Sequence, residues 1–268
     1  MSIKLLSLPK ITDRRGNLSF FEDGVPVPFN ISEVRWTYDI PGDTSKNIKR
    51  YINTDEIIIA LSGSYDVSTK SDTDEQTTHL NRAYNGLLLP KGTQKTLDNF
   101  STNSVALTIS ASNDTNVSKK AKQDIVTNEM YNVYDCHLIE IDKQNAENKG
   151  RYSTVKNNVE IPFDIKRIYY LYDVPFGVMR GGNAHKTLNQ VLFAVSGSFT
   201  VNINDGKVKR SITLNRPNQG LLIKPGIWRT IDNFSSGSVC LVLASEKYNP
   251  DDYIRKYNEF IDYRRNPI

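Results

Sequence analysis

The sequence predicts an all-β protein built from two tandem, jelly-roll-like β-barrels and a short C-terminal helix. Three observations support this fold class. An internal repeat spans half of the chain, each copy is a series of short apolar segments separated by turn residues, and one helical pattern stands near the C-terminus. Short strands with regularly spaced turn signals are typical of sandwiches and barrels.

The repeat appears when the 268-residue sequence is shifted against itself by 134 positions. Residues 81–112 then align without a gap with residues 215–246, and 14 of these 32 positions are identical. This period is much longer than that of a solenoid repeat, so it indicates a duplicated domain. We predict an N-terminal domain at 1–112, a polar linker at 113–130 and a C-terminal domain at 131–268.

Within the second copy, apolar segments such as IKRIYYLYD, GLLIKPG and SVCLVLAS recur about every ten residues, as strands would. Asn204-Asp205-Gly206 interrupts an alternating pattern and predicts a hairpin, because Asp-Gly readily adopts the positive φ of a tight turn. The tail at 250–265 predicts a helix that begins at Pro250 and carries its apolar residues on one face.

The composition is that of a globular protein, with 38% hydrophobic and 24% charged residues and a formal net charge of +4. The basic residues are dispersed, so we expect no nucleic-acid partner. Two cysteines, Cys136 and Cys240, cannot form a disulfide framework, and the start of the sequence has no apolar signal-peptide core. No apolar run reaches the roughly 20 residues of a membrane span. We therefore expect a cytoplasmic protein without a membrane partner.

The second copy carries a set of motifs that together are specific. They are IPFDIKRIYYLYDV, RGGNAHKTLNQVL, GSFTVNINDG and the stretch from GLLIKPGIWRT to YIRKYNEF. In order and spacing, residues 141–263 resemble the sugar nucleotide 3,4-ketoisomerases, which are cupin-fold enzymes of deoxysugar biosynthesis. The resemblance implies two cupin-type barrels and a dTDP-4-keto-6-deoxyglucose substrate. It also implies a place in the synthesis of O-antigen or another surface polysaccharide.

One residue departs from the family pattern. The family carries RGxHAHK, whereas this chain reads Arg180-Gly181-Gly182-Asn183-Ala184-His185-Lys186. Asn183 thus stands where the resemblance implies a catalytic base. The asparagine is either a divergence from the family or a substitution that would trap the substrate, because an amide approximates imidazole in size but cannot accept a proton.

We weighed a metal site because many cupins bind metal through two histidines, a glutamate and a later histidine, donors that suit divalent ions. Here those positions hold Asn183, His185, Gln190 and Arg229, so one ligand of four remains. We therefore expect no metal and no other cofactor. Moving a ketone from carbon 4 to carbon 3 is acid–base chemistry, for which histidine is suited near neutral pH.

His185 is accordingly the main catalytic candidate, as a proton donor or shuttle, with Tyr169 and the altered position Asn183 beside it. In a strand, Phe163, Ile165, Arg167 and Tyr169 share one face. A buried arginine is costly without an anion, which the pyrophosphate of a nucleotide sugar would supply. The predicted substrate-binding residues are Arg167, Arg180, Gln190, Trp228 and Arg229. For Arg167 and Arg180 the alternative is a salt bridge at the rim, and for Trp228 it is ordinary core packing.

The first copy keeps the turn and core residues but none of these functional ones, so we expect a scaffold domain. Its equivalents of the site residues are Lys46, Lys49, Tyr51, Glu33, Arg35, Gln94 and Lys95. Family members tend to form dimers that exchange an N-terminal strand, and the fused pair could imitate such a dimer within one chain. Two alternatives stay open: a non-catalytic cupin that binds a nucleotide sugar, and a sugar epimerase. Association into a homodimer is also open.

Overall fold

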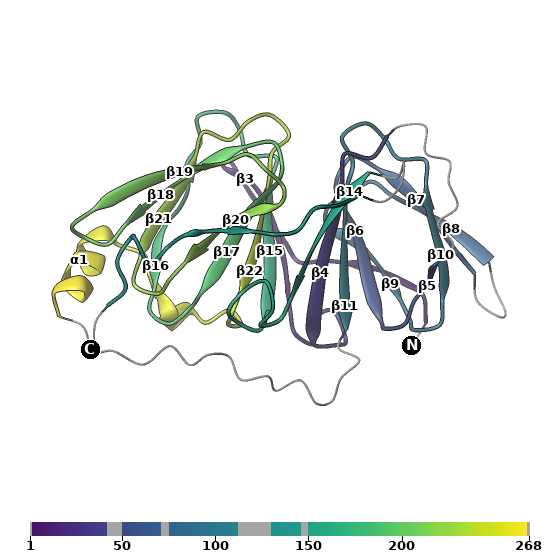
Figure 1. Ribbon diagram of the computed structural model, residues 1–268, viewed down its shortest axis with the longest axis horizontal. Helices are drawn as coiled ribbons and strands as arrows, with labels where there is room; N and C mark the ends of the chain where they lie inside the picture. Colours follow the sequence, from purple (N-terminus) through teal and green to yellow (C-terminus); the bar gives the residue numbers. More distant parts are fainter. Residues whose placement is uncertain (1, 42–49, 71–74, 112–129, 146–149, 267–268) are drawn as a thin grey trace.

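Two β-barrels lie side by side in the computed structural model of the chain (Figure 1), which describes residues 2–41, 50–70, 75–111, 130–145 and 150–266. Strands dominate both barrels, so the predicted all-β class with two tandem barrels is confirmed. Residues 113–129 of the predicted linker lie outside the described residues.

Each barrel is formed by a seven-stranded sheet and a smaller sheet that faces it. In the first barrel the smaller sheet has four strands, and in the second it has five. The large sheet of the first barrel has the order β1 (Lys4–Ser7), β9 (Asn85–Leu89), β6 (Glu56–Ser62), β11 (Val105–Ala111), β4 (Ile31–Tyr38), β14 (Arg151–Lys156), β13 (Gln144–Asn145). Its smaller sheet has the order β5 (Arg50–Tyr51), β10 (Gln94–Asp98), β7 (Tyr65–Lys70), β8 (Glu75–Leu80).

The second barrel repeats this arrangement. Its large sheet has the order β12 (Leu138–Glu140), β20 (Gln219–Ile223), β17 (Gln190–Ser196), β22 (Val239–Ala244), β15 (Arg167–Tyr172), β3 (Gly16–Glu22), β2 (Lys10–Asp13). Its smaller sheet has the order β19 (Lys209–Leu214), β18 (Phe199–Asn204), β21 (Trp228–Asp232), β16 (Arg180–His185), β23 (Tyr253–Ile254).

The two repeats exchange a hairpin. Strands β2 and β3 of the first repeat complete the sheet of the second barrel, where β3 pairs with β15. Strands β13 and β14 of the second repeat complete the first barrel, where β14 pairs with β4. The exchange crosses the boundaries that the sequence predicts, because residues 10–22 belong to the sheet of the second barrel. Each hairpin covers an edge strand that would otherwise present unpaired backbone groups.

Four hydrophobic clusters lie in the described part of the chain. One fills each barrel, a third lies between the two large sheets, and a smaller one packs the C-terminal helix against β16 and β23. On β17, Leu192 faces the barrel interior, while Val191 and Phe193 face the core between the barrels. On β6, Ile58 and Ile57 divide in the same way. Strands covered on both faces read as continuous apolar runs, which explains the segments EIIIALS and QVLFAVS.

The hairpin predicted at residues 204–206 is present between β18 and β19. The C-terminal helix is shorter than predicted: α1 spans Tyr257–Arg265, preceded by the 3-10 helix η1 (Pro250–Asp252) and by β23. Ile254 of β23 pairs with Ala184 of β16. Pairing with this sheet edge overrides the helical pattern, because it satisfies backbone groups of both segments. The strand containing Arg167 also begins later than predicted, so Phe163 and Ile165 pack between the barrels.

Candidate active site

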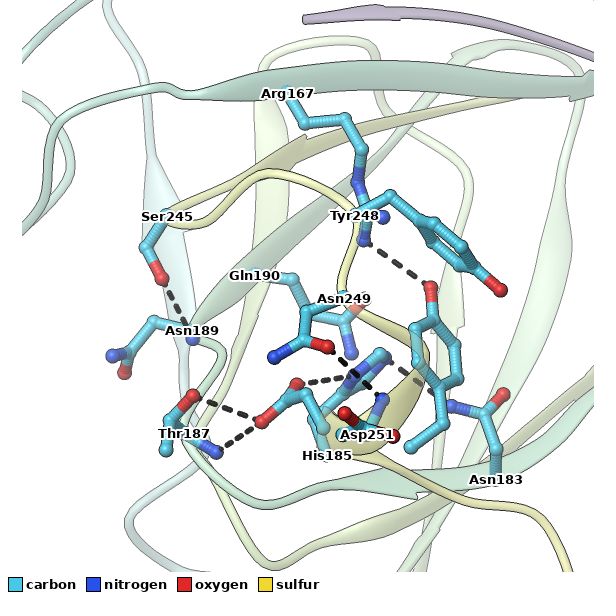
Figure 2. Close-up of polar contacts among 12 residues, drawn as sticks. Arg167, Asn183, His185, Thr187, Asn189, Gln190, Ser245, Tyr248, Asn249 and Asp251 are labelled. Carbon is cyan, nitrogen blue, oxygen red and sulfur yellow. Dashed lines mark hydrogen bonds and ion pairs between the residues drawn. The ribbon is translucent and has the colours of Figure 1, made fainter.

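The ring of His185 lies inside the second barrel at the end of β16, with 2% of the residue exposed. Its Nδ1 is 2.9 Å from Oδ2 of Asp252, which belongs to η1. Its Nε2 is 3.2 Å from the amide nitrogen of Asn183. Figure 2 shows Asn183 and His185 side by side, beneath the segment that carries Tyr248. The structure therefore brings the two residues of the altered histidine motif into one buried hydrogen-bonded group.

The glycines of the motif give β16 its shape at this point. Gly181 and Gly182 have φ angles of +81° and +80°, and the pairing of β16 with β21 shifts register between Gly181 and Asn183. Only glycine adopts such angles readily. A Cβ atom on Gly181 would also come within 2.9 Å of the guanidinium group of Arg229. We conclude that a bulge, which commonly re-aims side chains beside active sites, directs Asn183 into the barrel.

Burial is the largest influence on the charge of His185. It lowers the pKa of the imidazole to about 4, helped by the positive charges of Arg229 and Arg167 and opposed by Asp252. For Asp252, burial would raise the pKa, but hydrogen bonds from His185 and Thr187 outweigh it and lower the pKa to about 2. At neutral pH the pair is therefore a neutral imidazole beside a carboxylate, and the free ring nitrogen can accept a proton.

Arg167 and Arg229 give the barrel interior its positive charge, and 4% and 5% of these residues are exposed. Arg167 contacts the hydroxyl of Tyr253 at 3.3 Å, and Arg229 contacts the hydroxyl of Tyr169 at 3.0 Å. Among the residues that the structure describes, no carboxylate lies within ion-pair distance of either guanidinium, and both Nε atoms lack a hydrogen-bond partner. Two buried cations without counterions favour an anionic ligand.

The phenol of Tyr169 connects Arg229 to Gln190. Its hydroxyl donates to Oε1 of Gln190 at 3.0 Å and accepts from Arg229. Burial raises the pKa of Tyr169, so the phenol stays protonated near neutral pH. The structure thus brings together five of the predicted site residues with Arg167, namely Asn183, His185, Tyr169, Gln190 and Arg229.

Two predicted substrate-binding residues lie elsewhere. Arg180 donates to the carbonyl oxygen of Arg15 at 2.9 Å and lies 3.6 Å from Oδ1 of Asp13, so the exchanged hairpin already neutralises it. Trp228 packs against α1, with its ring 5.3 Å from that of Tyr257. Strand alternation explains the second case, because a strand that directs Arg229 inward directs its neighbour outward. For both residues, the alternative weighed above describes the observed contacts.

The C-terminal segment supplies site residues that the sequence reasoning missed. Asp252 holds His185, Tyr253 packs edge-on to its ring at 4.3 Å, and Tyr248 lies beside Arg167. The sequence pattern at Pro250-Asp251-Asp252 predicts only a helix start. A signal was present, because the offset of 134 places Asp251 and Asp252 over Val117 and Ser118, so the first copy lacks both acidic residues.

The interior of the first barrel differs in its charge balance. Lys95 forms an ion pair with Glu56, and Arg35 forms one with Glu33 at 2.9 Å. The offset of 134 residues places Lys95 and Glu56 at the positions of Arg229 and Gln190. Lys95 and Arg35 therefore have carboxylate partners within the first barrel, whereas Arg167 and Arg229 have none among the residues that the structure describes. Lys46 and Lys49 fall outside the described residues, as does the side chain of Tyr51.

The remaining histidines are peripheral, as expected. His79 is exposed and lies 2.6 Å from Asp66, and His137 is exposed near the carbonyl of Asp135. Within the described ranges, no three His, Cys, Asp or Glu side chains gather as a metal site would require. Nor does any described helix combine the length and apolar character of a membrane span. A cleft of about 320 Å³ lies at the junction of the barrels, lined by Lys10, Arg82 and Tyr84 among others and by none of the residues around His185.

Comparison with known proteins shows which family the chain resembles in sequence. The model of the family FdtA, described as "WxcM-like, C-terminal", matches residues 1–119 and again residues 134–265. The TDP-4-oxo-6-deoxy-alpha-D-glucose-3,4-oxoisomerase of Aneurinibacillus thermoaerophilus is 41% identical over 121 residues, which are 45% of this chain and 87% of the relative.

Solved structures with related sequences each cover about half of the chain. A 3,4-ketoisomerase from Helicobacter canadensis is 45% identical over 49% of this chain and 98% of its own, with a TM-score of 0.47. A histidine-to-asparagine variant of the 3,4-ketoisomerase QdtA from Thermoanaerobacterium thermosaccharolyticum, in complex with TDP-4-keto-6-deoxyglucose, is 39% identical over 49% of this chain and 95% of its own, with a TM-score of 0.48. Because the family model matches both repeats, the chain belongs to the FdtA family of WxcM-like, C-terminal domains.

Proposed function

We propose that the second barrel is a sugar nucleotide 3,4-ketoisomerase that converts dTDP-4-keto-6-deoxyglucose to a dTDP-3-keto-6-deoxyhexose. The observation that carries this proposal is the buried, neutral imidazole of His185 beside two arginines that have no carboxylate partner among the described residues. The activity named for the 41% identical relative supports the choice of substrate.

The reaction requires a proton to leave carbon 3, an enediolate to form, and a proton to reach carbon 4. His185 accepts the first proton at Nε2, because its lowered pKa leaves that nitrogen unprotonated near neutral pH. Tyr169 remains a neutral phenol, and in the complex its single O–H would turn from Gln190 to the sugar oxygen on which charge develops. The protonated imidazole then delivers the proton to carbon 4, while the proton of the 3-hydroxyl passes to the oxygen on carbon 4. The ketone then stands at carbon 3, and the imidazole returns to its starting state.

Arg167 and Arg229 are the residues that we assign to the diphosphate and to the charge of the intermediate. Guanidinium groups suit this role because they donate parallel hydrogen bonds to phosphate oxygens. The bound anion would also offset the positive charge that lowers the pKa of His185. Binding would therefore make the imidazole a better base in the complex than in the free protein. Such a reaction belongs in the cytoplasm, where we place this protein.

Asn183 favours a second candidate function. Its amide nitrogen lies 3.2 Å from Nε2 of His185, where the family motif has a second imidazole, and an amide cannot transfer the proton. The second barrel would then bind the nucleotide sugar without converting it. An epimerase of the same fold is a third candidate, and it would exchange hydrogen at carbon 3 or 5 without moving the ketone.

One experiment separates these functions. The full chain and its Asn183→His variant are incubated with dTDP-4-keto-6-deoxyglucose in D₂O and followed by proton NMR, with His185→Gln as the inactive control. A ketone at carbon 3 supports the proposal, and a large gain in the Asn183→His variant would identify Asn183 as the cause of slow turnover. Binding of dTDP without turnover in either form would favour the binding protein. Deuterium uptake with the ketone still at carbon 4 would favour the epimerase.

A further inference from the structure

The carboxylate of Asp252 accepts three hydrogen bonds from His185 and from Thr187, which follows the end of β16. Oδ2 lies 2.9 Å from Nδ1 of His185, while Oδ1 accepts from the backbone N–H of Thr187 at 2.7 Å and from its hydroxyl at 2.8 Å. The backbone is tied as well, since the N–H of Lys186 donates to the carbonyl of Asp252 at 2.9 Å. Asp252 therefore has one orientation, and that orientation faces the imidazole (Figure 2 labels Thr187 and His185).

These contacts determine which ring nitrogen carries the proton. An ionised carboxylate only accepts hydrogen bonds, so Nδ1 of His185 must be the protonated nitrogen. Nε2 then presents a lone pair, and its neighbour is the amide nitrogen of Asn183, which is a donor. Asp252 and Asn183 thus both favour the tautomer in which Nδ1 of His185 carries the proton. Tyr253 holds the ring plane from the side, at 4.3 Å and an interplanar angle of 65°.

We infer that Asp252 is a positioning residue that fixes the Nδ1–H tautomer of His185 and so makes Nε2 the nitrogen that transfers the proton. The inference rests on the proposed function for the reaction that it serves. It extends that function to a segment at the other end of the repeat, 67 residues after the histidine. Asp252 acts through His185 and not on the sugar.

The Asp252→Asn variant tests this inference sharply, because Thr187 fixes how the new amide must lie. The backbone N–H of Thr187 can only donate and so requires an acceptor, which places the amide oxygen where Oδ1 was and turns the amide nitrogen toward His185. A donor at that position makes Nδ1 the acceptor and moves the ring proton to Nε2. The change keeps the size of the side chain and reverses the tautomer.

The readout is the imidazole nitrogen spectrum of the uniformly ¹⁵N-labelled full chain. It has three histidines, and His79 and His137 are exposed reference signals. We expect the Nδ1–H form of His185 in the unaltered chain and the Nε2–H form in Asp252→Asn. We also expect kcat to fall by on the order of 10²-fold or more while KM changes little. Asp251→Asn is the matched control, because Asp251 is the exposed neighbour and should change neither quantity.

Two results would overturn the inference: an unchanged tautomer in Asp252→Asn, or a reversed tautomer with unchanged kcat. If Asp252→Asn does not fold, Asp252→Glu serves instead, because it retains an acceptor and should retain the Nδ1–H form. An Nε2–H form in that variant would again contradict the inference. If neither the unaltered chain nor Asn183→His turns over the sugar, the proposed function fails, whereas the tautomer in these spectra still decides the role of Asp252.

Discussion

The indole N–H of Trp36 donates a hydrogen bond to the carbonyl oxygen of Pro217 at 2.9 Å, across the junction of the two barrels. The repeat contains the reciprocal bond, in which the hydroxyl of Tyr170 donates to the carbonyl of Ala83. Each residue of the second bond stands 134 positions from its counterpart in the first. The two barrels are therefore joined by an approximately two-fold interface within one chain, as in a symmetric dimer.

We expect Trp36→Ala to destabilise the whole chain. Trp36 is fully buried, and its ring lies 4.8 Å from that of Phe193 in the other barrel. Removal of a buried aromatic side chain costs about 3–5 kcal/mol of unfolding free energy. Equilibrium denaturation in urea measures this loss. Phe176→Ala is the control, because Phe176 is 95% exposed and should change stability by less than about 0.5 kcal/mol. Equal stability of both variants would contradict a shared core.

We expect residues 131–268 expressed alone to aggregate or to show weak activity. They lack β2 and β3, so β15 loses its edge partner, and Val191 and Phe193 lose the opposite half of their core. Size-exclusion chromatography and the sugar turnover assay measure the outcome, with the full chain as the control. A stable, monomeric and fully active fragment would remove the scaffold role of the first repeat.

Stability should fall between pH 6.5 and pH 4. The pKa of His185 is about 4 in the folded protein and about 6.5 when unfolded, because burial disfavours the charged ring. Between these values the unfolded chain binds the additional proton, so acid favours unfolding. The contribution is complete above pH 6.5, and about 2–3 kcal/mol of it is lost by pH 4.5. Denaturation at several pH values should show a smaller loss in His185→Gln. His79→Gln should retain the dependence, because His79 is exposed.

Arg167→Met should weaken dTDP binding by roughly 10–100-fold, which corresponds to the loss of one or two hydrogen bonds to a charged group. Methionine replaces the aliphatic part of the arginine side chain but carries no charge. The substitution therefore removes a buried guanidinium that has no carboxylate partner in the described part of the chain. Calorimetric titration with dTDP measures the change. Arg216→Met is the control, because Arg216 is exposed on a turn. Unchanged affinity for dTDP in Arg167→Met would contradict the assignment of the diphosphate to Arg167.

Local patterns predicted the features that depend on neighbouring residues. Asp-Gly at 205–206 predicted the hairpin between β18 and β19, and the alternation of Arg167 and Tyr169 predicted their common face. The helix prediction at 250–265 was wrong in its first half, where the segment pairs with β16. Sequence periodicity could not reveal that pairing, because it reflects only neighbouring residues and contains no information about a sheet edge that lies nearby in space.

The sequence by itself determined that the chain is a duplication of one β-barrel domain, and that only the second copy carries His185 with its glycine-rich motif. The strand pattern and the register of the repeat are enough for these two conclusions, because the first depends on neighbouring residues and the second on comparing the sequence with itself. Only the tertiary structure decided which barrel each hairpin completes, that Asp13 neutralises Arg180, and that Asp252 orients His185. These contacts join residues 67 to 167 positions apart, which is too far along the chain for a local pattern to reveal them. Their choice depends on the packing of the whole chain.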